Sequence, residues 1–245
     1  MLSTPQNSAP EGHPAQVDEA LASGLAALRQ RLAAAARTAG RDVRSITLLA
    51  VSKGQPATRL KAALSLGLTQ FGENYLDEAL PKIAALADTP AEWHFIGHLQ
   101  GNKTRPVAEN FSWVHGIDRL RIAQRLSDQR LADAPPLNVC VQVNIAGEQS
   151  KSGVPPDEAL PLLRDVAKLP RLRLRGLMCM LPFDLPEPEQ RRYFAALRGL
   201  LESANADGLA LDTLSMGMSG DLDSAVAEGA TLVRIGTALF GPRPT

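Results

Sequence analysis

The chain has 245 residues, of which 44% are hydrophobic and 21% charged, a composition typical of a folded globular protein. Its 26 basic residues equal its 26 acidic residues, so the sequence lacks the positive excess expected of a nucleic-acid-binding protein. No apolar stretch reaches the roughly 18 residues that a membrane-spanning helix needs.

The N-terminal segment predicts a tail. Residues 1–15 are rich in Pro, Ser and polar residues, which cannot bury enough surface to become ordered, so we expect a flexible tail followed by one domain over residues 16–245. The segment has neither the basic nor the apolar part of a signal peptide, and we expect a cytoplasmic protein. Cys140 and Cys179 lie in apolar runs without a CxxC pair, so we expect both to be buried and reduced.

The remaining sequence predicts one long helix and then alternating strands and helices. Leucines at helical spacing predict a helix over Val17–Thr38. Short runs rich in β-forming residues predict strands at Ile46–Val51, Gln70–Gly72, Trp93–Ile96, Trp113–His115, Leu137–Asn144, Leu172–Met178, Thr213–Met216 and Leu232–Ile235. Helical patterns follow the first seven strands at Pro56–Leu66, Tyr75–Leu86, Lys103–Asn110, Arg119–Leu131, Asp157–Lys168, Glu187–Asn205 and Asp221–Glu228.

This alternation predicts a single (β/α)8 TIM-type barrel with an additional N-terminal helix. About eight strands fit the length normal for that fold, and alternating elements produce a parallel sheet. The competing architecture is an open, doubly wound sheet. The first strand is not followed by the Gly-x-Gly-x-x-Gly turn that is typical of many such sheets, and this favours the barrel.

Functional side chains of such barrels gather at the carboxyl ends of the strands, and Lys53 closes the first strand. A lysine in a desolvated barrel mouth loses part of its protonation and exposes a nucleophilic amine, which is what a Schiff base requires. The alternative is a structural lysine whose ammonium extends to water.

The ends of the last two strands resemble a phosphate cradle. Ser219 precedes a helix, and Gly236 with Thr237 begins another turn, so backbone amides and hydroxyls are available for an anion. Ordinary helix capping by Ser219 is the alternative. Arg234 lies on the last strand, where it serves either a ligand or an ion pair with a neighbouring strand.

Other chemistries have weaker support. His94 and His98 are four residues apart but lie on a strand and its loop, so they do not form a zinc-binding helix, and we expect no metal site. No nucleophile elbow is present for Ser-His-Asp chemistry. Met216 and the other methionines of the strand ends are interpreted as packing residues on their pattern alone.

Several long motifs resemble those of the pyridoxal phosphate homeostasis proteins, relatives of the barrel domain of alanine racemase. The matching motifs are Ala50–Lys53, Phe71–Tyr75, Trp93–Lys103, Val141–Asn144, Ser150–Gly153, Gly176–Met178, Ser215–Asp221 and Val233–Gly236. Together they extend over most of the chain from about residue 48 to residue 241.

The resemblance implies a role for each candidate residue. Lys53 would form a Schiff base with pyridoxal 5′-phosphate (PLP), and Arg234 would face the pyridine nitrogen. Asn74 would lie beside the ring and Met216 would line it. The phosphate would be bound by Ser219, Gly236 and Thr237.

The resemblance also implies a monomer that stores PLP and delivers it to PLP-dependent apoenzymes, with effects on amino-acid and keto-acid balance. An arginine at the pyridine nitrogen keeps it unprotonated, which weakens the ring as an electron sink and suits a carrier or a restrained racemase rather than a transaminase. Racemase relatives take a tyrosine base from a second domain that is not expected here. A true PLP enzyme would need a second acid or base, for which Tyr75 and His98 are the candidates, so weak racemase-like activity stays open.

A third hypothesis is a barrel enzyme that acts on phosphorylated substrates without PLP. One departure from the family pattern is Gly116, where serine is expected.

Overall fold

Eight parallel strands close into a barrel in the computed structural model, which describes residues 14–148 and 152–241, with side chains from Glu19 onward. Neighbouring strands follow the chain order, and β1 pairs with β8 to complete the ring. The strands are β1 (Thr47–Val51), β2 (Gln70–Glu73), β3 (Glu92–Phe95), β4 (Trp113–Ile117), β5 (Leu137–Gln142), β6 (Leu172–Met178), β7 (Thr213–Ser215) and β8 (Leu232–Ile235).

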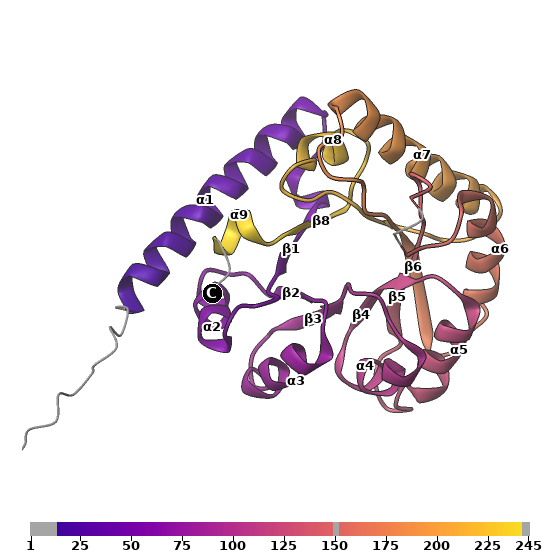
Figure 1. Cartoon of the computed structure of the whole chain (residues 1–245), viewed down its shortest axis with the longest axis horizontal. Coiled ribbons are helices and arrows are strands. Elements are labelled where there is room, and N and C mark those ends of the chain that lie inside the picture. Colours follow the sequence, from indigo (N-terminus) through magenta and orange to yellow (C-terminus); the bar gives the residue numbers. More distant parts are fainter. Residues whose placement is uncertain (1–13, 149–151, 242–245) are drawn as a thin grey trace, which may run out of the picture.

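Helices surround the barrel, as Figure 1 shows. They are α1 (Pro14–Thr38), α2 (Ala57–Ser65), α3 (Leu76–Ala85), α4 (Thr104–Asn110), α5 (Leu120–Gln129), α6 (Pro156–Val166), α7 (Glu187–Ala206), α8 (Leu222–Ala227) and α9 (Thr237–Phe240), with 3-10 turns η1 (Val43–Ser45) and η2 (Gly101–Lys103). The predicted (β/α)8 barrel with its N-terminal helix is therefore confirmed. The open-sheet alternative is wrong, because β1 and β8 are hydrogen-bonded neighbours.

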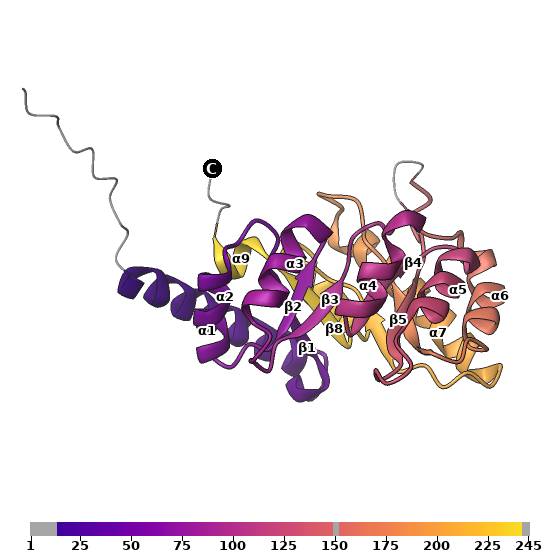
Figure 2. The ribbon, with the colours of Figure 1, turned by 90° about the horizontal axis from the view of Figure 1, so that it is seen from below.

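The boundaries differ from the predicted ones by a few residues. β4 continues to Ile117, two residues beyond the expected end, and β5 ends at Gln142, two residues early. The predicted tail over residues 1–15 lies almost wholly outside the described residues. α1 begins at Pro14 and extends past α9, as Figure 2 shows from below.

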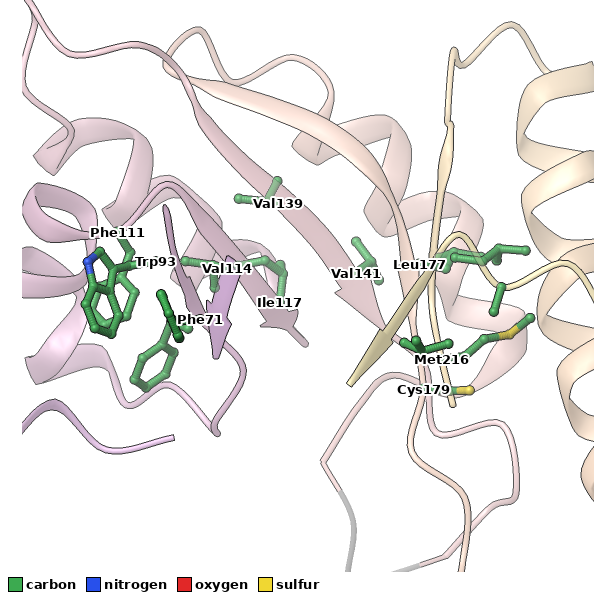
Figure 3. Packing of buried hydrophobic residues seen from close by; sticks show 14 of the residues in the cluster. Phe71, Trp93, Phe111, Val114, Ile117, Val139, Val141, Leu177, Cys179 and Met216 are labelled. Atoms are coloured by element: carbon green, nitrogen blue, oxygen red, sulfur yellow. The ribbon is translucent and has the colours of Figure 1, made fainter. Parts of the chain in front are cut away.

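The main hydrophobic core lies between the outer face of the barrel and the helices. Outward-facing strand residues such as Phe71, Val139 and Leu177 belong to it, and Figure 3 shows part of this packing. The barrel interior holds two smaller apolar clusters, one of which contains Leu49 and Leu232. Strand side chains alternate between the two faces, so one set packs under the helices and the other fills the interior.

The cysteines are both buried, as expected. Burial in apolar surroundings raises the pKa of the Cys140 thiol to about 12, which keeps it protonated at neutral pH. None of the helices within the described part of the chain is long and apolar enough to cross a membrane.

Two cavities lie at opposite ends of the barrel. The upper cavity, at the carboxyl ends of the strands, has a volume of about 750 Å³. The lower cavity, at the amino ends, has a volume of about 620 Å³. Catalytic and binding groups of this fold belong to the carboxyl end, so the upper cavity is the candidate site.

Candidate functional site

The upper cavity brings together most of the residues that the sequence identified. Its walls contain Val51, Lys53, Asn74, Ile96, Met180, Pro182, Phe183, Asp184, Leu185, Pro186, Gln190, Met218, Ser219, Gly220, Asp221, Arg234, Gly236 and Thr237. Six of the seven expected residues are in this set, and Met216 is the exception. A cavity of this size is within the range of ligand pockets in proteins.

Lys53 stands on a loop whose backbone is held on both sides. The amide of Ser52 donates to the carbonyl of Gly72 at 2.9 Å, which continues the ladder of β1 and β2. The amide of Gly54 donates to a carboxylate oxygen of Glu78 at 2.8 Å. Gly54 has a φ of 72°, so the chain turns sharply there after the lysine. These contacts fix where the Lys53 side chain enters the cavity.

A buried ion pair supports this loop from below. Lys82 lies 2.8 Å from Oε1 of Glu73 and also donates to the carbonyl of Ser52 at 2.9 Å. The hydroxyl of Ser52 donates to the same Glu73 oxygen at 2.6 Å. Burial raises the pKa of Glu73, while the bonds from Lys82 and Ser52 act in the opposite direction. Sequence analysis missed this pair, because neither residue lines the cavity and their partners come from three elements.

Arg234 is the buried cation of the upper cavity, with 5% of its surface exposed. One terminal nitrogen donates to the hydroxyl of Ser215 at 2.8 Å, and the other donates to the carbonyl of Cys179 at 2.7 Å. Burial lowers the pKa of the guanidinium, and the nearby Asp221 carboxyl acts in the opposite direction. The planar guanidinium is therefore held in one orientation by β7 and the residue after β6.

The turn after β7 differs from simple helix capping. α8 begins at Leu222, and the residue at its N-cap position is Asp221, so Ser219 does not cap the helix. Gly217 has a φ of 97°, which reverses the chain toward the cavity. The carboxyl of Asp221 accepts from the amide of Met218 at 2.5 Å, and burial raises its pKa. Ser219 therefore stands on a closed turn in the cavity wall.

Gly236 and Thr237 occupy the start of α9, beside the end of β1. A Cβ atom on Gly236 would lie 3.4 Å from the carbonyl oxygen of Val51. The backbone after β8 therefore packs against the end of β1, in the wall of the cavity that also contains Ser219. The two turns therefore face one cavity from neighbouring strands, as the sequence predicts.

Asn74 carries a buried polar atom without a hydrogen-bond partner among the described residues. Its side-chain oxygen is inaccessible to solvent, and the residue lines the cavity. A Cβ atom on Gly97 would overlap the backbone of Asn74, so glycine at 97 is what permits this placement. A Cβ on Gly116 would in turn lie 2.9 Å from the carbonyl of Gly97. The departure at Gly116 thus belongs to the packing behind Asn74.

Met216 differs from its expected position. Its side chain is fully buried in the main core with Leu177 and Cys179, as Figure 3 shows, and does not line the cavity. Ser215 points into the barrel, where it contacts Arg234, so the alternation of the strand turns Met216 outward toward the helices. Met218, beyond the reversal of the chain, lines the cavity instead.

One wall was not identified from the sequence. Residues 182–186, in the loop between β6 and α7, contribute a side of the cavity together with Met180 and Gln190. Asp184 in this loop has a φ of 59°. Positive φ at a residue other than glycine is uncommon and tends to occur at functional sites. No sequence pattern indicated this backbone conformation at Asp184.

The candidate acid–base residues for an enzyme lie outside the cavity wall. Tyr75 is 62% exposed, and the Nδ1 atom of His98 lies 3.0 Å from the hydroxyl of Ser152. Neither residue lines the upper cavity. Residues 149–151, part of one family motif, lie outside the described residues. Within the described ranges, no group of three or more His, Cys, Asp or Glu side chains could hold a metal ion.

Comparisons with known proteins agree with this geometry. Residues 24–244 match the family model described as "Alanine racemase, N-terminal domain". The pyridoxal phosphate homeostasis protein of Pseudomonas aeruginosa is 57% identical, covering 91% of this chain and 96% of its own length. PipY of Synechococcus elongatus, solved with PLP bound, is 36% identical with a TM-score of 0.79, covering 90% of this chain and 100% of that one.

Alanine racemase itself shares the fold. The enzyme from Corynebacterium glutamicum superposes with a TM-score of 0.68 at 20% identity, over 93% of this chain and 62% of the enzyme. At this identity the likeness concerns the barrel and not the activity.

Proposed function

Because the chain belongs to the family of pyridoxal phosphate homeostasis proteins, we propose that it holds PLP in the upper cavity and acts in the homeostasis of this cofactor. The observation that carries the proposal is the convergence of Lys53, Arg234 and Asn74 on one cavity. These groups come from β1, β8 and the end of β2, and they offer an amine, a cation and an unsatisfied amide oxygen.

The residues present fit the cofactor. Asn74 lines the cavity, and because its buried oxygen has no donor among the described residues, its amide can turn over without losing a hydrogen bond and present its N–H groups to a ligand oxygen. Arg234 offers further N–H groups beyond the two hydrogen bonds described above. Ser219, Gly236 and Thr237 offer hydroxyl and backbone donors to a phosphate from two neighbouring turns. Met216 supports this wall from the core rather than lining it.

Each side chain has a distinct task in this proposal. PLP, when bound, supplies an aldehyde that an amine captures and a ring that withdraws electrons. Lys53 provides that amine from a loop fixed by Ser52 and Gly54. Arg234, which has no acceptor, presents only N–H donors to the ring nitrogen and leaves it without a proton. The carboxylate of Asp221 accepts a hydrogen bond from the amide of Met218, and this bond reduces its electrostatic repulsion of a phosphate in the cavity.

We further propose that turnover is small and that the protein is a carrier rather than an enzyme. Two arguments support this: Arg234 would face the ring nitrogen, a partner that suits a carrier or a restrained racemase, and Tyr75 and His98 are not among the residues that line the upper cavity. The relatives' name speaks of the homeostasis of PLP, and for this chain we propose that this role consists of storing PLP and delivering it to PLP-dependent apoenzymes. A monomeric state and a cytoplasmic location stay predictions from the sequence.

The test is spectroscopic. Purified protein is mixed with PLP, its visible absorption is recorded, and borohydride reduction is followed by peptide mass mapping. We expect a new visible band and the cofactor mass on the peptide that contains Lys53. Labelling scattered over surface lysines would refute the proposal. An amino-acid racemase assay on the wild type and on Tyr75→Phe, measured in parallel, is expected to show little turnover in either.

A further inference from the structure

A continuous chain of hydrogen-bonded side chains crosses the interior of the barrel. It begins at Arg234 in the upper cavity and ends at Glu92 in the lower cavity. The lining of the lower cavity includes Gln70, Glu92, His94, Trp113 and Asp212. The intermediate members of the chain are Ser215, His115, His94 and Gln70.

The upper half of the chain is fully buried. Arg234 donates to the hydroxyl oxygen of Ser215 at 2.8 Å, and the same oxygen lies 2.8 Å from Nδ1 of His115. Nε2 of His115 lies 2.9 Å from Nδ1 of His94. Burial lowers the pKa of His94 to about 3 and lowers that of His115 well below its ordinary value. Both rings are therefore neutral at physiological pH, and each carries one proton.

The lower half ends on a carboxylate. Nε2 of His94 lies 2.5 Å from the amide oxygen of Gln70, and the amide nitrogen of Gln70 donates to Glu92 at 2.5 Å. The second oxygen of Glu92 accepts from the indole N–H of Trp113 at 3.0 Å. An ionised carboxylate only accepts hydrogen bonds, so both donors must point toward Glu92.

Because Glu92 only accepts hydrogen bonds, the donor and the acceptor of every other bond between these side chains are determined. Gln70 must turn its nitrogen to Glu92, so its oxygen accepts from Nε2–H of His94. Nδ1 of His94 is then the acceptor for Nε2–H of His115. Nδ1 of His115 in turn accepts from the hydroxyl of Ser215, whose oxygen accepts from Arg234. All the donors thus point the same way, from the cation at one end to the anion at the other.

We propose that Glu92 is a positioning residue for the upper cavity. Through the polarised hydrogen bonds it sets the tautomers of His94 and His115. These tautomers set the orientation of the Ser215 hydroxyl and so the strength of its hydrogen bond from Arg234. The direction of the chain follows from the contacts alone. Its effect on PLP rests on the proposed function, so the two parts are tested separately.

The Glu92→Gln substitution is expected to exchange donor and acceptor in the hydrogen bonds between Gln70 and Ser215. The new amide has one oxygen for two donors. The indole of Trp113 can only donate, so it keeps that oxygen, and the new amide nitrogen faces Gln70. Gln70 must then turn over, and each proton behind it moves to the opposite partner. His94 and His115 both change from the Nε2–H to the Nδ1–H tautomer.

The first experiment measures these tautomers by nitrogen-15 NMR of the ring nitrogens in PLP-free protein. We expect Nε2–H at both histidines in the wild type and Nδ1–H at both in Glu92→Gln. The matched control is Asp212→Asn, which alters another carboxylate of the lower cavity that contacts Arg175 and Thr213 but not the chain. Nδ1–H in the wild type, or no change in Glu92→Gln, would overturn the proposal.

A double variant separates positioning from general damage. Trp113→Phe combined with Glu92→Gln removes the donor that captured the new oxygen, so this oxygen can again accept from Gln70. We expect the original Nε2–H tautomers to return in this variant. A loss of tautomer order that the double variant does not restore would indicate structural damage and contradict the proposal.

The second experiment measures PLP affinity and the visible band in the same variants. After reversal the oxygen of Ser215 accepts from both Arg234 and His115, and its hydroxyl hydrogen loses its acceptor on His115, which weakens the hydrogen bond to Arg234. We therefore expect a shifted band and about fivefold weaker binding in Glu92→Gln, the effect of one weakened hydrogen bond. Wild-type values are expected in Asp212→Asn. Reversed tautomers with unchanged PLP binding would refute the positioning role. If the wild type shows no PLP band, the proposed function fails, and the NMR result still decides the direction of the chain.

Discussion

The two ends of the barrel carry cavities of similar volume, about 750 Å³ above and 620 Å³ below, yet their polar groups are arranged differently. In the lower cavity, Arg175 forms a two-pronged ion pair with Asp212, stacks over Trp113 and donates to Asn138. In the upper cavity, Asn74 keeps a buried oxygen that no described residue satisfies.

The comparison teaches that size does not distinguish a binding site from a structural cavity here. A polar group that is satisfied by its neighbours stabilises the fold, whereas a buried group without a partner costs free energy unless a ligand completes it. The upper end is built for an occupant, and the lower end is largely complete in itself. Four predictions test this difference between the two ends of the barrel.

The largest effect is expected from Lys53→Ala, which removes the amine of the upper cavity. Covalent capture of PLP should be lost completely, because no other lysine lines the described wall of that cavity. The matched control is Lys61→Ala, an exposed lysine on α2, which should retain capture. Borohydride-fixed cofactor is measured by mass spectrometry. Retained stoichiometric labelling in Lys53→Ala would contradict the assignment of the upper cavity.

The next effect concerns the support beneath the Lys53 loop. Lys82→Met leaves the carboxylate of Glu73 buried without its cation, and we expect a loss of about 3–5 kcal/mol in the free energy of unfolding. Urea denaturation measures it. Adding Glu73→Gln to this variant should recover part of the loss, since the buried charge is then gone. Equal stability of the single and double variants would show that the ion pair does not hold this loop.

A smaller effect is the pH dependence of the buried histidines. The unfolded chain takes up a proton at His94 below pH 6.5, whereas the folded chain does so only near pH 3. The unfolded state therefore binds more protons between these values, and stability falls as the pH is lowered through this window. We expect His94 to contribute a loss of about 2 kcal/mol between pH 6.5 and 5.

The measurement is denaturant unfolding at several pH values in the wild type and in His94→Gln. The variant should lose stability less steeply on acidification. Glutamine at position 94 cannot take up a proton in this pH range, so the difference between the two slopes isolates the contribution of His94. A wild-type stability that is flat from pH 7 to 5 would show that the two buried histidines accept protons in the folded state.

The smallest effects have opposite signs at the two ends. Asn138→Ala in the lower cavity removes bonds to Ser112 and Arg175 and should destabilise the protein by about 1 kcal/mol, with PLP binding unchanged. Asn74→Ala removes an oxygen without a partner, so PLP-free stability should be retained or slightly raised while PLP binding weakens about tenfold. Thermal unfolding and spectroscopic titration measure the pair. A marked loss of stability in Asn74→Ala would erase the contrast.

The sequence predicted the barrel because its signals are local. Alternating strand and helix patterns define a parallel sheet, and strand ends place Lys53 and Arg234 at one rim. For Met216 the resemblance implied a position at the ring, whereas the residue pattern alone indicated packing. The inward contact of Ser215 shows that Met216, the residue after β7, turns toward the core.

The remaining features depend on contacts between distant segments. Glu73 meets Lys82 across an element boundary, and the chain from Arg234 to Glu92 joins five strands. In the sequence, His94 and His115 stand in apolar runs that look like any buried strand. Only the closed barrel turns them toward each other, so no pattern along the chain could have announced the polarised interior.

The pairing of β1 with β8 has a consequence for the order of events during synthesis. Thr47 lies opposite Leu232, and the upper cavity takes Lys53 from the first strand and Arg234 from the last. The site thus does not exist until β8 has been synthesised and the ring has closed. Such late, long-range pairing is slow compared with local folding. Capture of the cofactor therefore requires a completed barrel, and the rate at which its absorption band appears measures the rate of the final folding step.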